Sequence, residues 1–150
     1  MLDPDLRDIL SALNAHEVKY LLVGGYAVGV YSEPRATKDL DIFIQSDPEN
    51  GEAVFRALAE YGAPLEGMTA ADFCNKPDSV FQIGVPPVRI DILQSISGVT
   101  FDEAWENRIT AFIDEIPTNV ISRDDLIRNK LAAGRRRDLL DVEDIREAAE

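Results

Sequence analysis

The chain has 150 residues, 45% of them hydrophobic and 29% charged, a composition that indicates a folded globular protein and excludes a disordered one. Its formal net charge of −13 disfavours general binding to the negatively charged backbones of nucleic acids. No apolar run approaches the roughly 20 residues of a membrane-spanning helix, and the acidic N-terminus lacks the basic region of a signal peptide. We therefore expect a cytoplasmic protein that binds no membrane, with residues 1–150 forming one domain.

Helical and strand patterns alternate along the chain. In the first half of the chain we expect a helix from Pro4 to about residue 15, a strand at 20–23, a short helix at 26–31, a strand at 40–45, a helix at 49–60 and a helical turn at 70–73. Strands at 80–85 and 88–93 follow, joined by a hairpin turn at Pro86 and Pro87. We then expect a short helix at 101–105 and, at the C-terminus, helices from 123 to Gly134 and at 138–148. Residues 108–113 and 116–121 form either a strand pair or one long strand bent around Pro117. This order predicts an α+β fold with a mixed sheet flanked by helices, the C-terminal helices lying at about 122–149.

Two aspartates, Asp39 and Asp41, lie one residue apart inside an apolar run that follows a Gly24-Gly25 turn. Because side chains alternate along a strand, both project from the same face, about 6.6 Å apart along the backbone. Burial penalises such charges unless a cation is nearby, and carboxylate oxygens on a rigid strand suit Mg²⁺ or Mn²⁺. Glycines after a strand indicate a backbone that lies against a bulky or anionic group.

Asp91 occupies a similar apolar run at 88–93. If that strand pairs with 40–45, Asp91 completes a carboxylate triad, which could hold one or two metal ions for an in-line phosphoryl displacement. Taken alone, Asp91 is equally consistent with a salt-bridged residue of an edge strand.

The Gly-Gly turn, the Asp39-Leu40-Asp41-Ile42 strand and the later Asp91 resemble the nucleotidyltransferase superfamily that includes DNA polymerase beta, over residues 20–93. The segments 35–38 and 130–139 look like the minimal nucleotidyltransferase branch associated with abortive infection and toxin–antitoxin systems. Gly25 departs from the pattern, because many members of the superfamily carry Ser there and use it to contact phosphate.

The resemblance implies transfer of NMP from an NTP (ATP, CTP, GTP or UTP) to an acceptor hydroxyl, with Mg²⁺ or Mn²⁺ as cofactor and a tRNA, a protein or a small molecule as acceptor. It implies catalytic and metal-binding roles for Asp39, Asp41 and Asp91, and nucleotide-binding roles for Gly24, Gly25, Thr37, Lys38 and Lys130. Lys130 is equally consistent with a solvated helix lysine.

A second reading is a non-catalytic module with the same fold, serving as a nucleotide sensor or as one component of a toxin–antitoxin pair. The small size and the acidity of the chain favour it, since an acidic surface suits a basic partner protein. Together with the nearby Asp138, Asp141 and Asp144, Arg135–Arg137 is interpreted as a solvated, charge-paired helix junction or, alternatively, as an acceptor-binding patch. Cys74 has no sequence partner for metal or thiol chemistry, and Trp105 and the Phe residues are expected in the core.

Overall fold

The computed structural model describes residues 3–33, 39–85 and 88–149 of the chain. Within these residues the strands are β1 (Tyr20–Val23), β2 (Asp39–Ile44), β3 (Val80–Val85), β4 (Val88–Leu93), β5 (Ile109–Ile113) and β6 (Ile116–Val120). They form one sheet in the order β3-β4-β2-β1-β6-β5, in which β2 pairs with β4, and β1 with β6, in parallel, while the other neighbours are antiparallel. The predicted mixed sheet is therefore confirmed.

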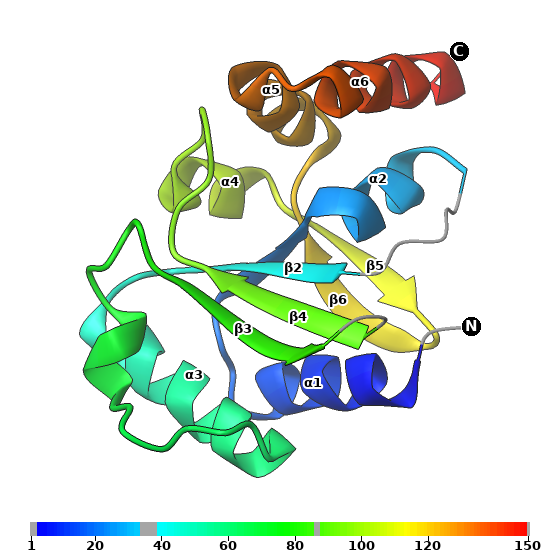
Figure 1. The fold of residues 1–150 in the computed structure, drawn as a ribbon. Helices are drawn as coiled ribbons and strands as arrows, with labels where there is room; N and C mark the ends of the chain where they lie inside the picture. The colour runs from blue at the N-terminus through cyan, green and yellow to red at the C-terminus, as the bar shows by residue number, and fades with distance from the viewer. Residues whose placement is uncertain (1–2, 34–38, 86–87, 150) are drawn as a thin grey trace.

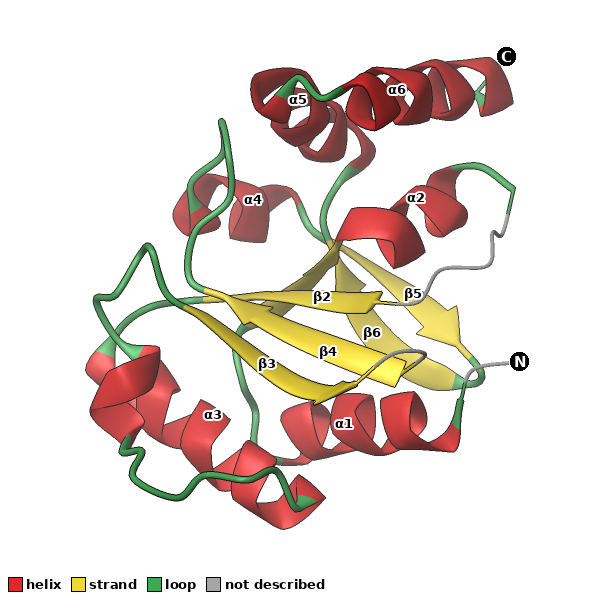
Figure 2. Ribbon diagram, viewed as in Figure 1, coloured by secondary structure: helices red, strands yellow, loops and turns green. Residues whose placement is uncertain are grey.

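Helices cover both faces of the sheet (Figure 1, Figure 2). They are α1 (Pro4–Ala15), α2 (Gly24–Tyr31), α3 (Pro48–Tyr61), α4 (Phe101–Asn107), α5 (Arg123–Ala133) and α6 (Arg136–Ala148), with a 3-10 turn, η1, at Ala70–Phe73. In Figure 1, α1 and α3 lie below the sheet, and α2, α4, α5 and α6 lie above it. The α+β class predicted from the sequence is confirmed.

The helix starts follow from local side-chain chemistry. The carboxylates of Asp3 and Asp47 and the hydroxyl of Ser122 each accept a hydrogen bond from a backbone N–H in the first turn of α1, α3 and α5, respectively. Such caps satisfy backbone donors that the helix itself leaves open. Gly134 ends α5 in the left-handed conformation that glycine adopts without strain.

The two faces of β2 differ. Leu40, Ile42 and Ile44 are fully buried and form part of the hydrophobic core. On the other face, Phe43 is buried, and its ring packs edge to face against Phe101 of α4, with the ring centroids 5.1 Å apart. Helix α4 thus covers one end of this face, and Asp39 and Asp41 lie at the other end.

The structure corrects three sequence expectations. Helix α2 begins at Gly24, two residues before the expected start, so the Gly-Gly turn is its first turn. β5 and β6 are an antiparallel pair, and the alternative of one long bent strand is wrong. Phe112 is 74% exposed on β5 and does not join the core, because β5 is an edge strand whose outer side chains face solvent. Pro86 and Pro87, the expected hairpin turn, lie outside the described residues.

Among the described residues, no helix has the length and apolar character that crossing a membrane requires.

Candidate active site

Three aspartates meet on two neighbouring strands. Asp39 and Asp41 belong to β2 and Asp91 to β4, and in the parallel register Asp41 stands directly beside Asp91. Adjacent strands are about 4.8 Å apart, so the three carboxylates share a small area on one face of the sheet. The sequence predicted this triad on the condition that the two strands pair, and the pairing of β2 with β4 is confirmed. We call these three aspartates, together with Arg89, the strand cluster.

Asp41 is the most perturbed member of the strand cluster. Burial, together with the charges of Asp91 and Asp39, raises the pKa of Asp41 to about 7, while the positive charge of Lys130 works in the opposite direction. A hydrogen bond between Asp41 and Asp91 adds to the increase, because it requires a proton on one of the two carboxyl groups. Carboxylates this close repel one another, and a cation or a proton must compensate the excess charge.

Arg89 lies between two of the aspartates. Its Nη2 atom is 2.8 Å from Asp39 Oδ2, and its Nε atom is 3.2 Å from Asp91 Oδ1. The second contact is an ion pair without the geometry of a hydrogen bond: Arg89 Nε and Asp91 Oδ1 are two of the three buried side-chain polar atoms of the described residues that have no hydrogen-bond partner. Unsatisfied buried groups of this kind are uncommon and concentrate at functional sites.

Gly24 brings the backbone against the strand cluster. It has a φ of +70°, and a Cβ atom at this position would collide with the carboxylate of Asp41. Only glycine combines this backbone conformation with so close an approach. The sequence predicted an anionic neighbour for the Gly-Gly segment, and the neighbour that the structure shows is the Asp41 side chain.

A second group of charges comes from the C-terminal helices. Lys130 Nζ, on α5, is 3.4 Å from Asp138 Oδ1 and 3.1 Å from Asp141 Oδ2, both on α6. Arg135, in the α5–α6 connection, donates a 2.7 Å hydrogen bond from Nε to Asp138 Oδ2. The Lys130 side chain is only 10% exposed, so the alternative of a solvated lysine is wrong. We call these four residues the helix cluster.

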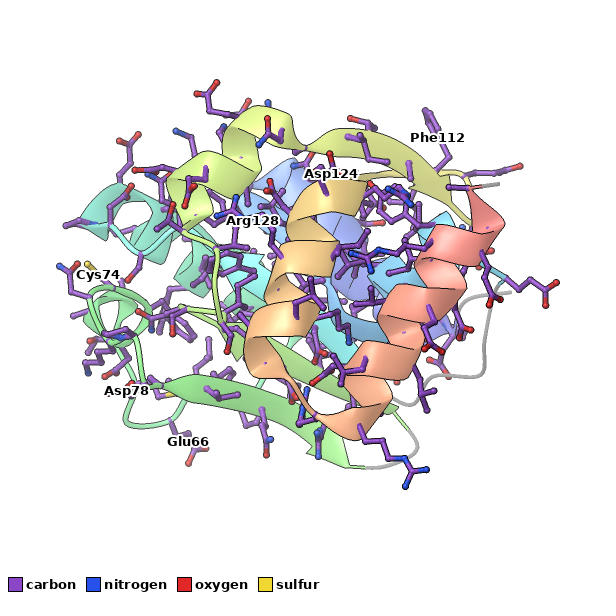
Figure 3. The ribbon with its side chains drawn as sticks, turned by 90° about the horizontal axis from the view of Figure 1, so that it is seen from above. Glu66, Cys74, Asp78, Phe112, Asp124 and Arg128 are labelled. Carbon is purple, nitrogen blue, oxygen red and sulfur yellow. The ribbon has the colours of Figure 1, made fainter. Side chains whose placement is uncertain are left out.

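Residues of both clusters line one pocket. It has a volume of about 600 Å³, which is within the range of small-molecule sites. Figure 3 shows α5 and α6 side by side over the sheet. The residues that line the pocket are Val23, Gly24, Gly25, Asp39, Asp41, Leu93, Ile96, Ser97, Asn129, Lys130, Ala133, Arg135, Arg137, Asp138 and Asp141. Asp91 is not among them, because it is 8% exposed and lies deeper, against Arg89.

The donor set of the strand cluster fits a hard divalent cation. It offers carboxylate oxygens from adjacent strands, one of which, Asp91 Oδ1, is buried without a hydrogen bond. Within the described residues, however, no three Asp, Glu, His or Cys side chains already converge as a metal-binding group. The contacts explain this: Asp39 and Asp91 are oriented toward the planar guanidinium of Arg89.

The remaining predicted site residues fall into three groups. Thr37 and Lys38 lie outside the described residues. Of the arginine tract, Arg135 is charge-paired as predicted, and Arg137 lines the pocket. Cys74 is a free, half-buried thiol at the end of the molecule away from α6 (Figure 3).

Sequence reasoning gave no role to Arg89. It gave Asp138 and Asp141 only the role of pairing with charges at the surface. Arg89 could have been found, because it lies two residues before Asp91 and must therefore share its strand face. Asp138 and Asp141 carried no such signal. Their role depends on the packing of α6 against α5, which brings both carboxylates to Lys130.

Fold and site together define a nucleotidyltransferase-like protein, and three solved structures have the same fold. The lincosamide antibiotic adenylyltransferase LnuA, solved with lincomycin bound, is 17% identical with a TM-score of 0.62, over 99% of this chain and 98% of its own. ANT(2")-Ia, solved with adenylyl-2"-tobramycin, is 14% identical with a TM-score of 0.64, over 97% and 87%. An antigenic nucleotidyltransferase-like protein from Paracoccidioides brasiliensis is 16% identical with a TM-score of 0.56, over 96% and 74%.

The chain belongs to the family described as nucleotidyltransferases of unknown function, DUF6036, whose family model matches residues 1–148. The resemblance to the nucleotidyltransferase superfamily is thereby confirmed. A comparison with curated protein sequences gave no match.

Proposed function

We propose that the protein is a metal-dependent nucleotidyltransferase that moves NMP from an NTP to an acceptor hydroxyl, with residues 1–150 acting as one catalytic unit. The observation that carries the proposal is the strand cluster: three carboxylates at adjacent positions of two paired strands, two of which line a pocket beneath α5 and α6. Family membership and the fold of the adenylyltransferases support transfer of a nucleotidyl group.

In this proposal Asp39, Asp41 and Asp91 hold Mg²⁺ or Mn²⁺, which neutralises charge on the triphosphate and on the leaving group. Gly24 and Gly25, at the start of α2, present backbone N–H groups to the phosphates, as helix N-termini do for anions. Lys130 lines the same pocket and adds positive charge there. Thr37 and Lys38 are further proposed contacts to the nucleotide.

The catalytic contribution of the chain is positioning and electrostatics. Asp91 is buried beside Asp41 on the neighbouring strand, where it orients Asp41 through their hydrogen bond. The α5–α6 pair lines the pocket opposite the sheet with Asn129, Lys130, Ala133, Asp138 and Asp141. A substrate bound between these helices and the sheet would displace water, which strengthens charge interactions there. Rate enhancement in phosphoryl transfer comes mostly from such positioning.

Isothermal titration of each of the four NTPs in the presence of Mg²⁺ tests the proposal. We expect at least one NTP to bind to the wild-type protein, and binding to be lost in Asp39→Ala/Asp41→Ala. The matched control is Asp78→Ala, an exposed aspartate in the loop before β3, at the end of the molecule away from α6 (Figure 3). Absence of binding by the wild-type protein, or equal binding by the double variant, would contradict the proposal.

The acceptor is sought by mass spectrometry after incubation with the four NTPs and Mg²⁺. Samples of tRNA, candidate proteins and small hydroxyl compounds are compared for a mass increase of one NMP. LnuA and ANT(2")-Ia were solved with antibiotic-derived molecules, so lincomycin and tobramycin are reasonable members of the small-molecule set.

The second candidate function is a nucleotidyltransferase-like module without catalysis, acting as a nucleotide sensor or as a toxin–antitoxin component. The ion pairs of Arg89 favour it, because they occupy two of the carboxylates that a metal would need. A stoichiometric basic partner in a pull-down, together with no NTP turnover on any acceptor, would support this function. Turnover that depends on Asp41 would exclude it.

A further inference from the structure

Arg89 shares the strand face of the three aspartates. It lies on β4 two residues before Asp91, and its Cα partner in the parallel register is Asp39 of β2. Its guanidinium bridges the two strands, with Nη2 2.8 Å from Asp39 Oδ2 and 3.3 Å from Asp91 Oδ2. A planar group with several N–H donors is suited to span two carboxylates in this way.

The bridge is incompletely satisfied. Arg89 Nε and Asp91 Oδ1 are 3.2 Å apart, yet neither buried atom forms a hydrogen bond. The Asp91 side chain is 11% exposed and has lost most of its hydration. An ion pair offsets this desolvation free energy only when its hydrogen-bond geometry is good. Here one of the two contacts between Arg89 and Asp91 lacks a hydrogen bond. Another cation can therefore replace Arg89 more easily than it could in a pair with both hydrogen bonds.

The same oxygen atoms would serve a metal ion. Asp39 Oδ2 and Asp91 Oδ1 accept the positive charge of Arg89 and are also ligands that a hard divalent cation would use. A guanidinium and a divalent cation repel each other, so contact of both with the same oxygens is unfavourable. At the same time, three neighbouring carboxylates need some positive charge when no metal is bound.

We infer that Arg89 is a built-in counterion, which holds Asp39 and Asp91 in the metal-free protein and must leave both carboxylates when a divalent cation binds. This inference rests on the proposed metal-dependent function. It makes Arg89 the residue that weakens binding of the metal alone. The nucleotide phosphates supply additional ligands, so the cation is taken up together with the NTP.

The test measures metal affinity and stability, without a catalytic assay. Mn²⁺ alone is titrated, with detection by electron paramagnetic resonance, into the wild-type protein, Arg89→Gln and Arg56→Gln. Arg56 is an exposed arginine of α3, on the opposite side of the sheet. Its substitution changes the net charge by the same amount as Arg89→Gln but lies away from the strand cluster. We expect the Kd for Mn²⁺ to fall at least about tenfold, which corresponds to about 1.4 kcal/mol, in Arg89→Gln only, since no guanidinium then has to leave the carboxylates.

We also expect the metal-free Arg89→Gln variant to melt at a lower temperature than the wild-type protein. Addition of Mn²⁺ should raise the melting temperature of the variant and remove this difference. Mn²⁺ binding by the wild-type protein without tightening in Arg89→Gln overturns the inference and leaves the proposed function standing. Failure of every variant to bind Mn²⁺, with or without NTP, overturns both.

A measurement on the unaltered protein covers the case in which Arg89→Gln does not fold. The Nε–H resonance of Arg89 is followed by ¹⁵N NMR during titration with diamagnetic Mg²⁺ and an NTP, after assignment by its absence from Arg89→Lys. We expect this resonance to move toward the position of a solvated arginine as the cation binds. A resonance that stays unchanged at saturation overturns the inference.

Discussion

The two charged clusters face the same pocket but differ in their balance of charge. The strand cluster has three carboxylates and one guanidinium, whereas the helix cluster has two carboxylates and two cationic side chains. Their carboxyl groups respond in opposite ways. Burial and like charges raise the pKa of Asp41 to about 7. Burial also acts to raise the pKa of Asp138, but the hydrogen bond from Arg135 and the charge of Lys130 outweigh it and lower that pKa.

The difference separates a cluster whose charges are balanced from one whose charges are not. The helix cluster satisfies its own charges and fastens α6 to α5. The strand cluster keeps an excess of negative charge on a rigid sheet, which is costly for the protein alone and which, in the proposed function, a divalent cation offsets. Substitutions in the two clusters should therefore have opposite effects on stability and on function.

The largest expected effect is on stability, from Asp138→Ala in the helix cluster. The substitution leaves Lys130 buried with Asp141 as its only carboxylate contact of the pair, and breaking a buried ion pair costs up to about 3–5 kcal/mol. Urea unfolding monitored by circular dichroism measures it. The control is Asp124→Ala on α5, whose side chain is 89% exposed and which should change stability by less than about 1 kcal/mol. Equal losses in both variants would show that the helix cluster does not fasten the helices.

The second effect is on activity, from Asp41→Asn in the strand cluster. We expect the rate of NMP transfer to fall about 10²–10³-fold, the scale for losing one electrostatic contribution to the transition state. Stability in metal-free buffer should stay equal or rise, because one repelling charge is removed. Rate and urea unfolding are measured on the same preparation, with Asp78→Asn as the control. A large loss of stability would assign Asp41 a structural role instead.

A smaller effect is expected from Gly24→Ala. The new Cβ meets the Asp41 carboxylate at a φ of +70°, so the variant should lose roughly 1–3 kcal/mol of stability and should bind nucleotide more weakly. Gly67→Ala is the matched control, since Gly67 has a φ of +77° but open space around a Cβ. The difference between the two melting temperatures isolates the contact with Asp41. If the two variants lose the same stability, strain alone accounts for Gly24.

The effect that is smallest between neighbouring measurements, one pH unit apart, is the pH dependence of stability in metal-free buffer. Asp41 has an unfolded pKa of 3.8 and a folded pKa of about 7, so the folded state holds the extra proton between these values. Its contribution to stability therefore decreases as pH rises from about 4 to 7, by at most about 1.4 kcal/mol per pH unit. Urea unfolding of the wild-type protein and Asp41→Asn at pH 5, 6 and 7 measures this slope, which should be absent from the variant.

The lowered pKa of Asp138 gives the opposite sign. Its contribution is present above the unfolded pKa of 3.8 and is lost as pH falls through the folded value. Unfolding of Asp138→Asn should therefore differ from the wild type most at neutral pH and least in acid. A difference that grows in acid would contradict the assignment.

Much of the fold followed from local patterns. The β1 strand and the α1 helix were predicted with their bounds, because each is an uninterrupted apolar run or an apolar face beginning at a strong cap. The pair Asp39 and Asp41 was visible for a similar reason: charges in an apolar strand are conspicuous without any tertiary information. The start of α2 was missed, because glycine gives no helical signal and the close approach of Gly24 to the Asp41 side chain is a tertiary contact.

The sequence by itself determined the chemistry available to this protein: carboxylates at strand spacing, a glycine pair before them and a third acid in a later strand. The tertiary structure alone decided how those charges are balanced. Pairing of β2 with β4 brought Arg89 to Asp39, and packing of α6 on α5 buried Lys130 between two carboxylates. The physical reason is that charge interactions depend on distance and burial in three dimensions, whereas strand alternation and helix caps are properties of neighbouring residues.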